Sequence, residues 1–276
     1  MARLLGTLLV ASSLLVGSFA VHDVRDASAQ VAAGAVGPGW LGIAMEKSKG
    51  PPGVVVTHVI KTSPALKSGL LEGDRLVKVD GSPVAAPAEV SSKVAGKGAG
   101  KALAMQLVRS GKLVDVSVVL APRPSSDQIF RMELIGEKLP NLPSLKVASG
   151  PGPAAYPALT GRVVLLDLFA TWCGPCLQLG PYYNSFHGKY GTQGLTVLAV
   201  SSEDPMILAG WSAKNAVSYT VASDPSDTLG GRLAAPAIPA SVLVDKHGVV
   251  REVALGFDLQ QVKRTEQLIQ ALLKEP

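Results

Sequence analysis

The sequence has 276 residues, which is long enough for two domains that each bury a hydrophobic core. Hydrophobic residues make up 47% of the chain and charged residues 17%, a balance that excludes extensive disorder. The formal net charge is +5, but lysine and arginine are scattered and no basic run alternates with aromatic residues. Nucleic acid is therefore not an expected partner.

The first 20 residues have the composition of a signal peptide or an N-terminal anchor. A positive start at residues 1–3 is followed by an apolar stretch over 4–16 and by small residues at 17–20. We expect export with cleavage, and the alternative is an uncleaved membrane anchor, because residues 4–21 are just long enough for one. The expected location is the periplasm or cell envelope. Residues 21–37 have no clear periodicity and are interpreted as a spacer.

Residues 38–121 have the pattern of a small, mostly β domain. Alternating apolar runs are bounded by turn residues such as Asp80-Gly81 and Ser110-Gly111-Lys112. The pattern predicts a partly open barrel from strands over 54–60, 76–79, 102–109 and 113–120, with a short helix over 88–94.

The segment SPALKSGLLEGDRL at 63–76, followed by Val79-Asp80-Gly81, resembles the PDZ domains of bacterial HtrA/DegP proteases. No serine-protease motif accompanies it, so we expect a binding module. The resemblance implies that a protein C-terminus or other extended peptide adds as a strand, with its carboxylate on a backbone loop. That loop is formed by Trp40, Leu41, Gly42 and Ile43. An apolar groove would be formed by Leu41, Ile43, Val90 and Val94, unless these side chains simply fill the barrel.

Residues 122–130 are rich in proline and serine and are interpreted as a linker before a second domain at 131–276. Strand and helix patterns alternate in this domain, which predicts an α/β fold. Strands are expected over 162–169, 195–201, 218–222, 240–244 and 249–255, and helices from 177 onward and over 204–215, 226–233 and 260–274. Asp204 is expected to cap the second of these helices.

The chain has two cysteines, Cys173 and Cys176, spaced Cys-x-x-Cys. Such a pair can close a redox-active disulfide or supply half of a zinc site. The four histidines show no metal-ligand spacing to the pair, so we expect neither a metal nor a cofactor beyond the disulfide. A strand before the pair and a helix after it place Cys173 at a helix N-terminus, where the helix dipole lowers the pKa of a thiol. Cys173 is therefore the predicted nucleophile, and Cys176, one turn later and more buried, the predicted resolving thiol.

The run LLDLFATWCGPC at 165–176 resembles thioredoxin, and the wider segment resembles the TlpA/ResA group of thioredoxin-like proteins. The resemblance implies a central mixed sheet flanked by helices, with an inserted helix and strand and a small N-terminal hairpin within 136–159. It also implies a cis peptide bond at Pro239, a backbone at Ile238 that faces the substrate, and a partly exposed Trp172 beside the substrate groove. Leu179 stands where ResA-like reductases tend to carry a glutamate.

Asp167 lies six residues before Cys173, where thioredoxin has a buried aspartate that moves protons to and from the resolving cysteine. A carboxyl group in an apolar strand is expected to have a raised pKa, which suits a general acid or base. The alternative is an exposed carboxylate at a strand edge.

These features predict an extracytoplasmic thiol-disulfide oxidoreductase, with Gly-Pro between the cysteines and Ile238 before the proline favouring a reductase. Its expected partners are protein thiols and disulfides, an electron donor or acceptor in the membrane, and a protein recruited by the PDZ domain. Two alternatives remain open. One is an adaptor in which PDZ recognition dominates, and the other is a thiol peroxidase, although Ala170 does not match the usual peroxidase motif.

Overall fold

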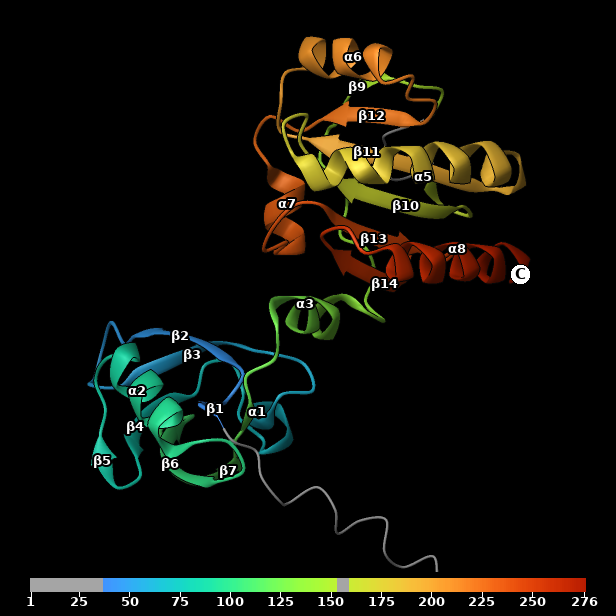
Figure 1. Ribbon diagram of the computed structural model, residues 1–276. Coiled ribbons are helices and arrows are strands. Elements are labelled where there is room, and N and C mark those ends of the chain that lie inside the picture. The colour runs from blue at the N-terminus through green and yellow to red at the C-terminus, as the bar shows by residue number, and fades with distance from the viewer. Residues whose placement is uncertain (1–36, 153–158) are drawn as a thin grey trace, which may run out of the picture.

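The computed structural model describes residues 37–152 and 159–276 (Figure 1). The predicted signal or anchor segment and nearly all of the spacer lie outside the described residues. Figure 1 shows two separate bodies, one mostly β and one α/β, with helix α3 (Ser126–Leu134) between them. In the described part of the chain, no helix is long and apolar enough to cross a membrane.

The N-terminal body is built on an antiparallel sheet in the order β2-β3-β4-β6-β7. Its strands are β2 (Ile43–Lys47), β3 (Val54–Val59), β4 (Arg75–Val79), β6 (Ala102–Arg109) and β7 (Lys112–Val119). The short strand β5 (Ser82–Pro83) pairs with β4, and β1 (Gly39–Trp40) pairs with β8 (Ala121–Pro122). Helices α1 (Pro64–Lys67) and α2 (Pro87–Lys97) complete the domain. The strands, the hairpin and the helix predicted over 88–94 are thus present.

Helix α3 begins inside the segment that was predicted to be a linker. Ser125 caps it by accepting a hydrogen bond from the backbone N–H of Gln128, whose side chain accepts from the N–H of Ser125 in return. This reciprocal capping box explains why a serine-rich stretch becomes helical. Phe130 is buried in the core of the C-terminal domain. The linker interpretation is therefore wrong from Ser126 onward.

The C-terminal body has a six-stranded mixed sheet in the order β14-β13-β10-β11-β12-β9. β10 pairs in parallel with β11 and antiparallel with β13, so it lies inside the sheet. The strands are β9 (Lys146–Ser149), β10 (Val163–Leu168), β11 (Leu195–Ser201), β12 (Thr220–Ser223), β13 (Ala240–Val244) and β14 (Val250–Leu255). The helices are α5 (Gly174–Tyr190), α6 (Pro205–Lys214), α7 (Thr228–Leu233) and α8 (Leu259–Lys274), with a short 3-10 turn, η1 (Gly191–Gln193), after α5.

Side chains from the two faces of this sheet enter two different cores. Alternate residues of β10, such as Leu165 and Leu166, point to opposite faces, as the strand period of two requires. One core contains buried residues of α5, α6 and α8, and the other contains Phe130 of α3 and residues of α7. Because all six residues of β10 are buried, the loop after it, which leads to the cysteines, is anchored to a fully enclosed strand.

The predicted α/β order is confirmed over 162–274, including Asp204 as the cap of α6. The small hairpin expected within 136–159 is not present in the described part of that segment. There, β9 is a single strand that pairs with β12 at the sheet edge, and Lys138 makes an isolated bridge to Val249. β9 thus covers the edge of β12, whose backbone polar groups would otherwise be unpaired, and it needs no local hairpin partner.

Candidate functional site

Cys173 and Cys176 are joined by a disulfide at the start of α5. Cys173 is the N-cap residue, and its Sγ accepts a hydrogen bond from the backbone N–H of Cys176 at 3.3 Å. Pro175 lies in the first turn, where its missing N–H leaves no helical bond unmade. The site therefore presents a sulfur to the backbone N–H groups that the helix leaves unpaired at its start.

The two cysteines are buried to nearly the same extent, 5% exposed for Cys173 and 6% for Cys176. The expectation that Cys176 is the more buried of the two is wrong in this disulfide-bonded form, because the bond holds both sulfurs in one environment. Trp172 is 76% exposed and stands directly beside them. A partner that reaches this disulfide therefore meets a large exposed aromatic ring first.

Asp167 lies on β10, with Ala199 of β11 on one side and Ser241 of β13 on the other. It is 3% exposed, so the alternative of an exposed carboxylate at a strand edge does not hold. Burial raises the pKa of the Asp167 carboxyl well above its usual value, and a hydrogen bond from the Tyr183 hydroxyl, 3.4 Å from Oδ1, opposes that rise. Burial also raises the pKa of Tyr183 well above its usual value, so its hydroxyl remains a donor.

The peptide bond between Ile238 and Pro239 is cis, as expected. Pro239 immediately precedes β13, and Ala240, the first residue of that strand, pairs with Leu168 at the end of β10. Ile238 is partly buried and packs against both cores of the domain. The C-terminal end of β10, which leads to the cysteines, and the segment that carries Pro239 thus lie next to each other in the sheet.

A pocket of about 300 Å³ opens beside this arrangement. Its walls include Trp172 and Ile238, together with Ser201 at the end of β11 and Asp224 and Asp227 near the start of α7. The pocket joins the exposed tryptophan to the segment before Pro239. The pocket was not predictable from the sequence, because residues from four separate segments form its walls.

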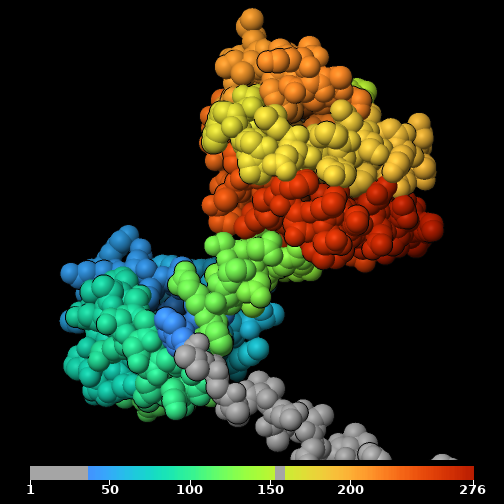
Figure 2. Space-filling view, viewed as in Figure 1, coloured from blue at the N-terminus to red at the C-terminus, as the bar shows by residue number. Residues whose placement is uncertain are grey.

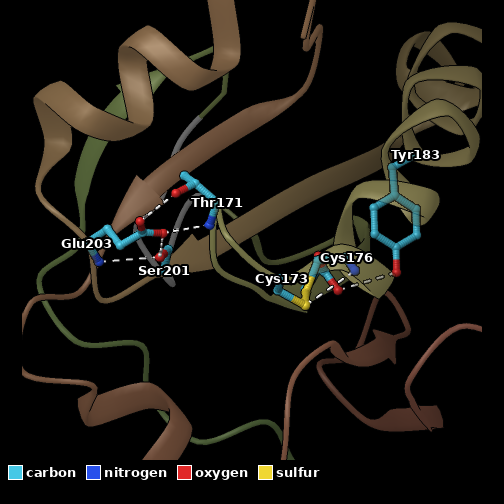
Figure 3. The surroundings of a disulfide bond; sticks show 7 residues. Thr171, Cys173, Cys176, Tyr183, Ser201 and Glu203 are labelled. Atoms are coloured by element: carbon cyan, nitrogen blue, oxygen red, sulfur yellow. Dashed lines mark hydrogen bonds between the residues drawn. A yellow bond between two sulfur atoms is a disulfide. The ribbon is translucent and has the colours of Figure 1, made fainter. Parts of the chain in front are cut away.

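Glu203, on the loop between β11 and α6, is the polar residue that sequence reasoning missed. Its carboxylate accepts hydrogen bonds from the backbone N–H and the hydroxyl of Thr171, at 2.7 and 2.6 Å, and from the hydroxyl of Ser201 at 3.0 Å (Figure 3). The available signal was the polar run Ser201-Ser202-Glu203 after an apolar strand. The contact to Thr171 spans 32 residues of sequence, so no local pattern indicates it.

Leu179 is buried in the core on the α5 side of the sheet. Its side chain is therefore packed in the core, and it offers no carboxylate there. In the ranges 37–152 and 159–276, no three or more histidine, cysteine, aspartate or glutamate side chains are grouped so as to hold a metal ion.

The predicted carboxylate-binding loop of the N-terminal domain is largely buried. Trp40 and Leu41 are 7% and 3% exposed, and the carbonyls of Leu41 and Gly42 accept hydrogen bonds from Ala65 and Ile60. Gly42 has a φ of 84°, and a Cβ there would lie 2.3 Å from the Cβ of Ser63. The loop thus needs glycine, and what it can offer a ligand is backbone.

The side chains expected to line the peptide groove divide into two groups. Leu41, Val90 and Val94 are buried in the domain core, which favours the alternative that they fill the barrel. Ile43 is only partly buried and belongs to β2, the terminal strand of the sheet. An incoming strand would therefore meet the edge of β2 near Ile43.

Comparison with protein families identifies both bodies. The family model described as Redoxin matches residues 134–269, and the model of the PDZ domain matches residues 39–120. The N-terminal body is thus similar to PDZ domains, and the C-terminal body has a thioredoxin-like fold that is similar to the Redoxin family. Both matched ranges lie within the domains expected at 38–121 and 131–276.

Relatives of both domains are known. The thiol-disulfide oxidoreductase ResA of Bacillus thuringiensis is 28% identical over 118 residues, which cover 42% of this chain and 65% of ResA. A probable periplasmic serine endoprotease, DegP-like, of Hahella chejuensis is 30% identical over 167 residues, covering 49% of this chain and 36% of that protein. The chain thus spans less than two thirds of the length of each. A solved structure from Chlorobium tepidum, provisionally assigned as the thiol:disulfide interchange protein DsbE, is 31% identical with a TM-score of 0.45 and covers 50% of this chain and 97% of its own.

Proposed function

We propose that this protein exchanges disulfides with cysteine pairs of other proteins through Cys173 and Cys176. The observation that carries the proposal is the disulfide at the N-terminus of α5, formed by the two cysteines of the sequence. Neither cysteine is used to staple the fold elsewhere, and the bond closes a loop of only four residues. The similarity of the Redoxin domain to ResA proteins, which are thiol-disulfide oxidoreductases, supports the same chemistry.

In the reducing direction, the Cys173 thiolate attacks one sulfur of a substrate disulfide. A mixed disulfide forms and the other substrate sulfur leaves as a thiolate, which takes up a proton. The Cys176 thiolate then attacks Cys173 Sγ, which restores the disulfide and releases the second substrate thiol. Two electrons pass to the substrate, and the same steps run backward when the protein acts as an oxidant.

Asp167 is proposed to accept the proton of Cys176 during the second step and to return it in the reverse reaction. A carboxyl group whose pKa is raised by burial holds a proton to higher pH than an exposed aspartate does, which suits a group that accepts and returns a proton. Ile238 is proposed to present its backbone to the substrate, and Trp172 to border the substrate groove. The pocket between these two residues supports that placement.

We further propose that the protein acts as a reductase in the periplasm or cell envelope. The Gly174-Pro175 pair between the cysteines supports the direction, and the composition of residues 1–20 supports the location. A reductase in that compartment needs a supply of electrons, so a dithiol carrier in the membrane is the expected donor. The PDZ domain is proposed to recruit a protein partner through its C-terminus or an extended segment, at the backbone of residues 40–43 and the edge of β2.

The first test is the reduction potential of the Cys173–Cys176 pair, with the full chain equilibrated in thiol/disulfide buffers and the thiols counted by alkylation and mass. A value near −250 mV or lower is the expected result for a reductase, whereas a value near about −120 mV would make the protein an oxidant. The absence of any reversible titration would refute the redox proposal and leave the adaptor alternative.

The second test is covalent trapping of the partner in cells. Cys176→Ala leaves Cys173 without its resolving thiol, so a mixed disulfide with the substrate should accumulate. Cys173→Ala is the matched control and should trap nothing. Equal recovery of adducts from both variants would mean that Cys173 is not the nucleophile.

A further inference from the structure

The turn that leads into Cys173 is held by two kinds of contact. Within the turn, the backbone N–H of Cys173 donates to the carbonyl of Ala170 at 3.1 Å. From outside, the Glu203 carboxylate accepts from both the N–H and the hydroxyl of Thr171. Figure 3 shows Thr171, on the loop after β10, and Glu203, on the loop after β11, facing each other. Hydrogen bonds to an ionised carboxylate are among the stronger ones in proteins.

Glu203 is itself fixed to the sheet at two points. The hydroxyl of Ser201, in the last position of β11, donates to its carboxylate and accepts from its backbone N–H. The hydroxyl of Ser223, at the end of β12, donates to its carbonyl oxygen at 2.6 Å. Through its carboxylate and its backbone together, Glu203 thus connects the turn of residues 170–173 to the ends of two buried strands.

We infer that Glu203 is a positioning residue that holds the turn of residues 170–173, and with it Cys173, at the N-terminus of α5. The inference rests on the proposed redox function of the cysteine pair. Glu203 acts through Thr171 and touches neither sulfur in this arrangement. When the turn is held, Cys173 Sγ stays within reach of the Cys176 N–H, which stabilises a thiolate in the reduced protein.

Two roles for Glu203 predict opposite results, which makes the inference testable. If its negative charge were what mattered, removing the charge would stabilise the Cys173 thiolate and lower the thiol pKa. If its position matters, removing the acceptor frees the turn, weakens the contact with the helix N-terminus and raises the thiol pKa. Glutamine keeps an oxygen for the Thr171 N–H and an amide group for the Thr171 hydroxyl, yet carries no charge.

The experiment measures the alkylation rate of Cys173 by iodoacetamide from pH 4 to pH 10 in the full chain carrying Cys176→Ala, so that Cys173 is the single thiol. Glu203→Ala and Glu203→Gln are compared in this background. Asp204→Ala is the matched control, because Asp204 is the next residue and caps α6 through the Met206 N–H without contacting Thr171. Circular dichroism checks that each variant is folded.

We expect Glu203→Ala to raise the midpoint of the pH profile by about one unit, which lowers the thiolate fraction about tenfold at pH values well below the midpoint. Glu203→Gln should keep the midpoint at or below that of the parent, and Asp204→Ala should leave it unchanged. An unchanged or lowered midpoint in Glu203→Ala would overturn the inference. If that variant does not fold, Thr171→Val removes only the 2.6 Å hydroxyl contact, and a midpoint that does not rise would overturn it equally.

The failure of this inference can be distinguished from failure of the proposed function. The native Cys173–Cys176 pair is titrated separately in thiol/disulfide buffers. If it titrates reversibly and Glu203→Ala does not shift the Cys173 profile, only the role of Glu203 is refuted. If the native pair does not titrate, the redox function itself is refuted.

Discussion

Replacing Asp167 with asparagine should stabilise the oxidised protein, and the gain should grow with pH. Asp167 lies on β10 inside the sheet and is 3% exposed. Burial raises the pKa of its carboxyl well above the usual value, so the ionised form is less favourable in the folded protein than in the unfolded chain. Asparagine has nearly the same shape and cannot ionise, which removes this cost.

The sign follows from which state binds the proton more tightly. The folded state of the wild-type protein keeps the proton on Asp167 to higher pH, so the contribution of Asp167 to stability is greatest below about pH 3.9, the value of an unfolded aspartate. It then falls by up to about 1.4 kcal/mol per pH unit until the pH passes the folded-state pKa. The difference in unfolding free energy between Asp167→Asn and the wild type should rise with that slope and then level off.

The assay is urea unfolding of both oxidised proteins at intervals from pH 4 to pH 8, with the disulfide intact. The pH at which the difference levels off is the folded-state pKa of Asp167. In a companion variant, Tyr183→Phe, the carboxyl loses the hydrogen bond that opposes the rise. Its stability should therefore continue to fall to a higher pH than in the wild type. A difference that stays constant from pH 4 to pH 8 would refute the reasoning, because Asp167 would then ionise equally in both states.

Three further substitutions test the scaffold around the site. Gly42→Ala should destabilise the PDZ domain by at least about 1–2 kcal/mol, because alanine is strained at the positive φ of this position. The new Cβ would also overlap that of Ser63, which adds to the cost. An unchanged thermal melt would contradict this expectation. Phe130→Ala should cost about 3–5 kcal/mol in urea unfolding of the thioredoxin-like domain, whereas a cost below about 1 kcal/mol would mean that α3 does not pack there. The hydrogen bond with Glu133 raises the pKa of His58, so the contact between these residues is fully present below pH 6.5 and is lost as the pH rises through the raised value. Protection factors of the α3 amides, which correct for the intrinsic rise of exchange with pH, should therefore fall over that pH range in the wild type and not in Glu133→Gln. Equal pH dependence of the protection factors in both would refute the assignment.

Local sequence signals were enough to predict the elements that carry the site. β10 is a continuous apolar run that ends where the cysteines begin, and the Cys-Gly-Pro-Cys spacing suits the first turn of a helix. Each of these signals lies within a dozen residues, where strand period, helix capping and proline geometry act directly. The burial of Asp167 followed for the same reason, since its neighbours on β10 are all apolar.

What was not predicted depends on contacts between distant segments. Glu203 reaches Thr171 across the ends of two parallel strands, and the pairing of those strands is not encoded near either residue. β9 has four residues, too few for a clear pattern, and it finds its partner in β12 far along the chain. α3 is different, because the capping box of Ser125 and Gln128 is a local signal that the linker interpretation overlooked.

Helix α3 changes how the two domains can work together. Its Phe130 is buried in the thioredoxin-like domain, while its Glu133 accepts hydrogen bonds from His58 and from the backbone N–H of Lys61 in the PDZ domain. Figure 2 shows the same segment in contact with both bodies.

A flexible linker would let a recruited partner sample many orientations, so that little of its time would be spent with a disulfide near Cys173. A helix that is packed on one domain and hydrogen-bonded to the other restricts those orientations. The partner of the PDZ domain would then be held in a limited range of positions relative to the cysteine pair, and its chain would need to reach from the edge of β2 to Trp172.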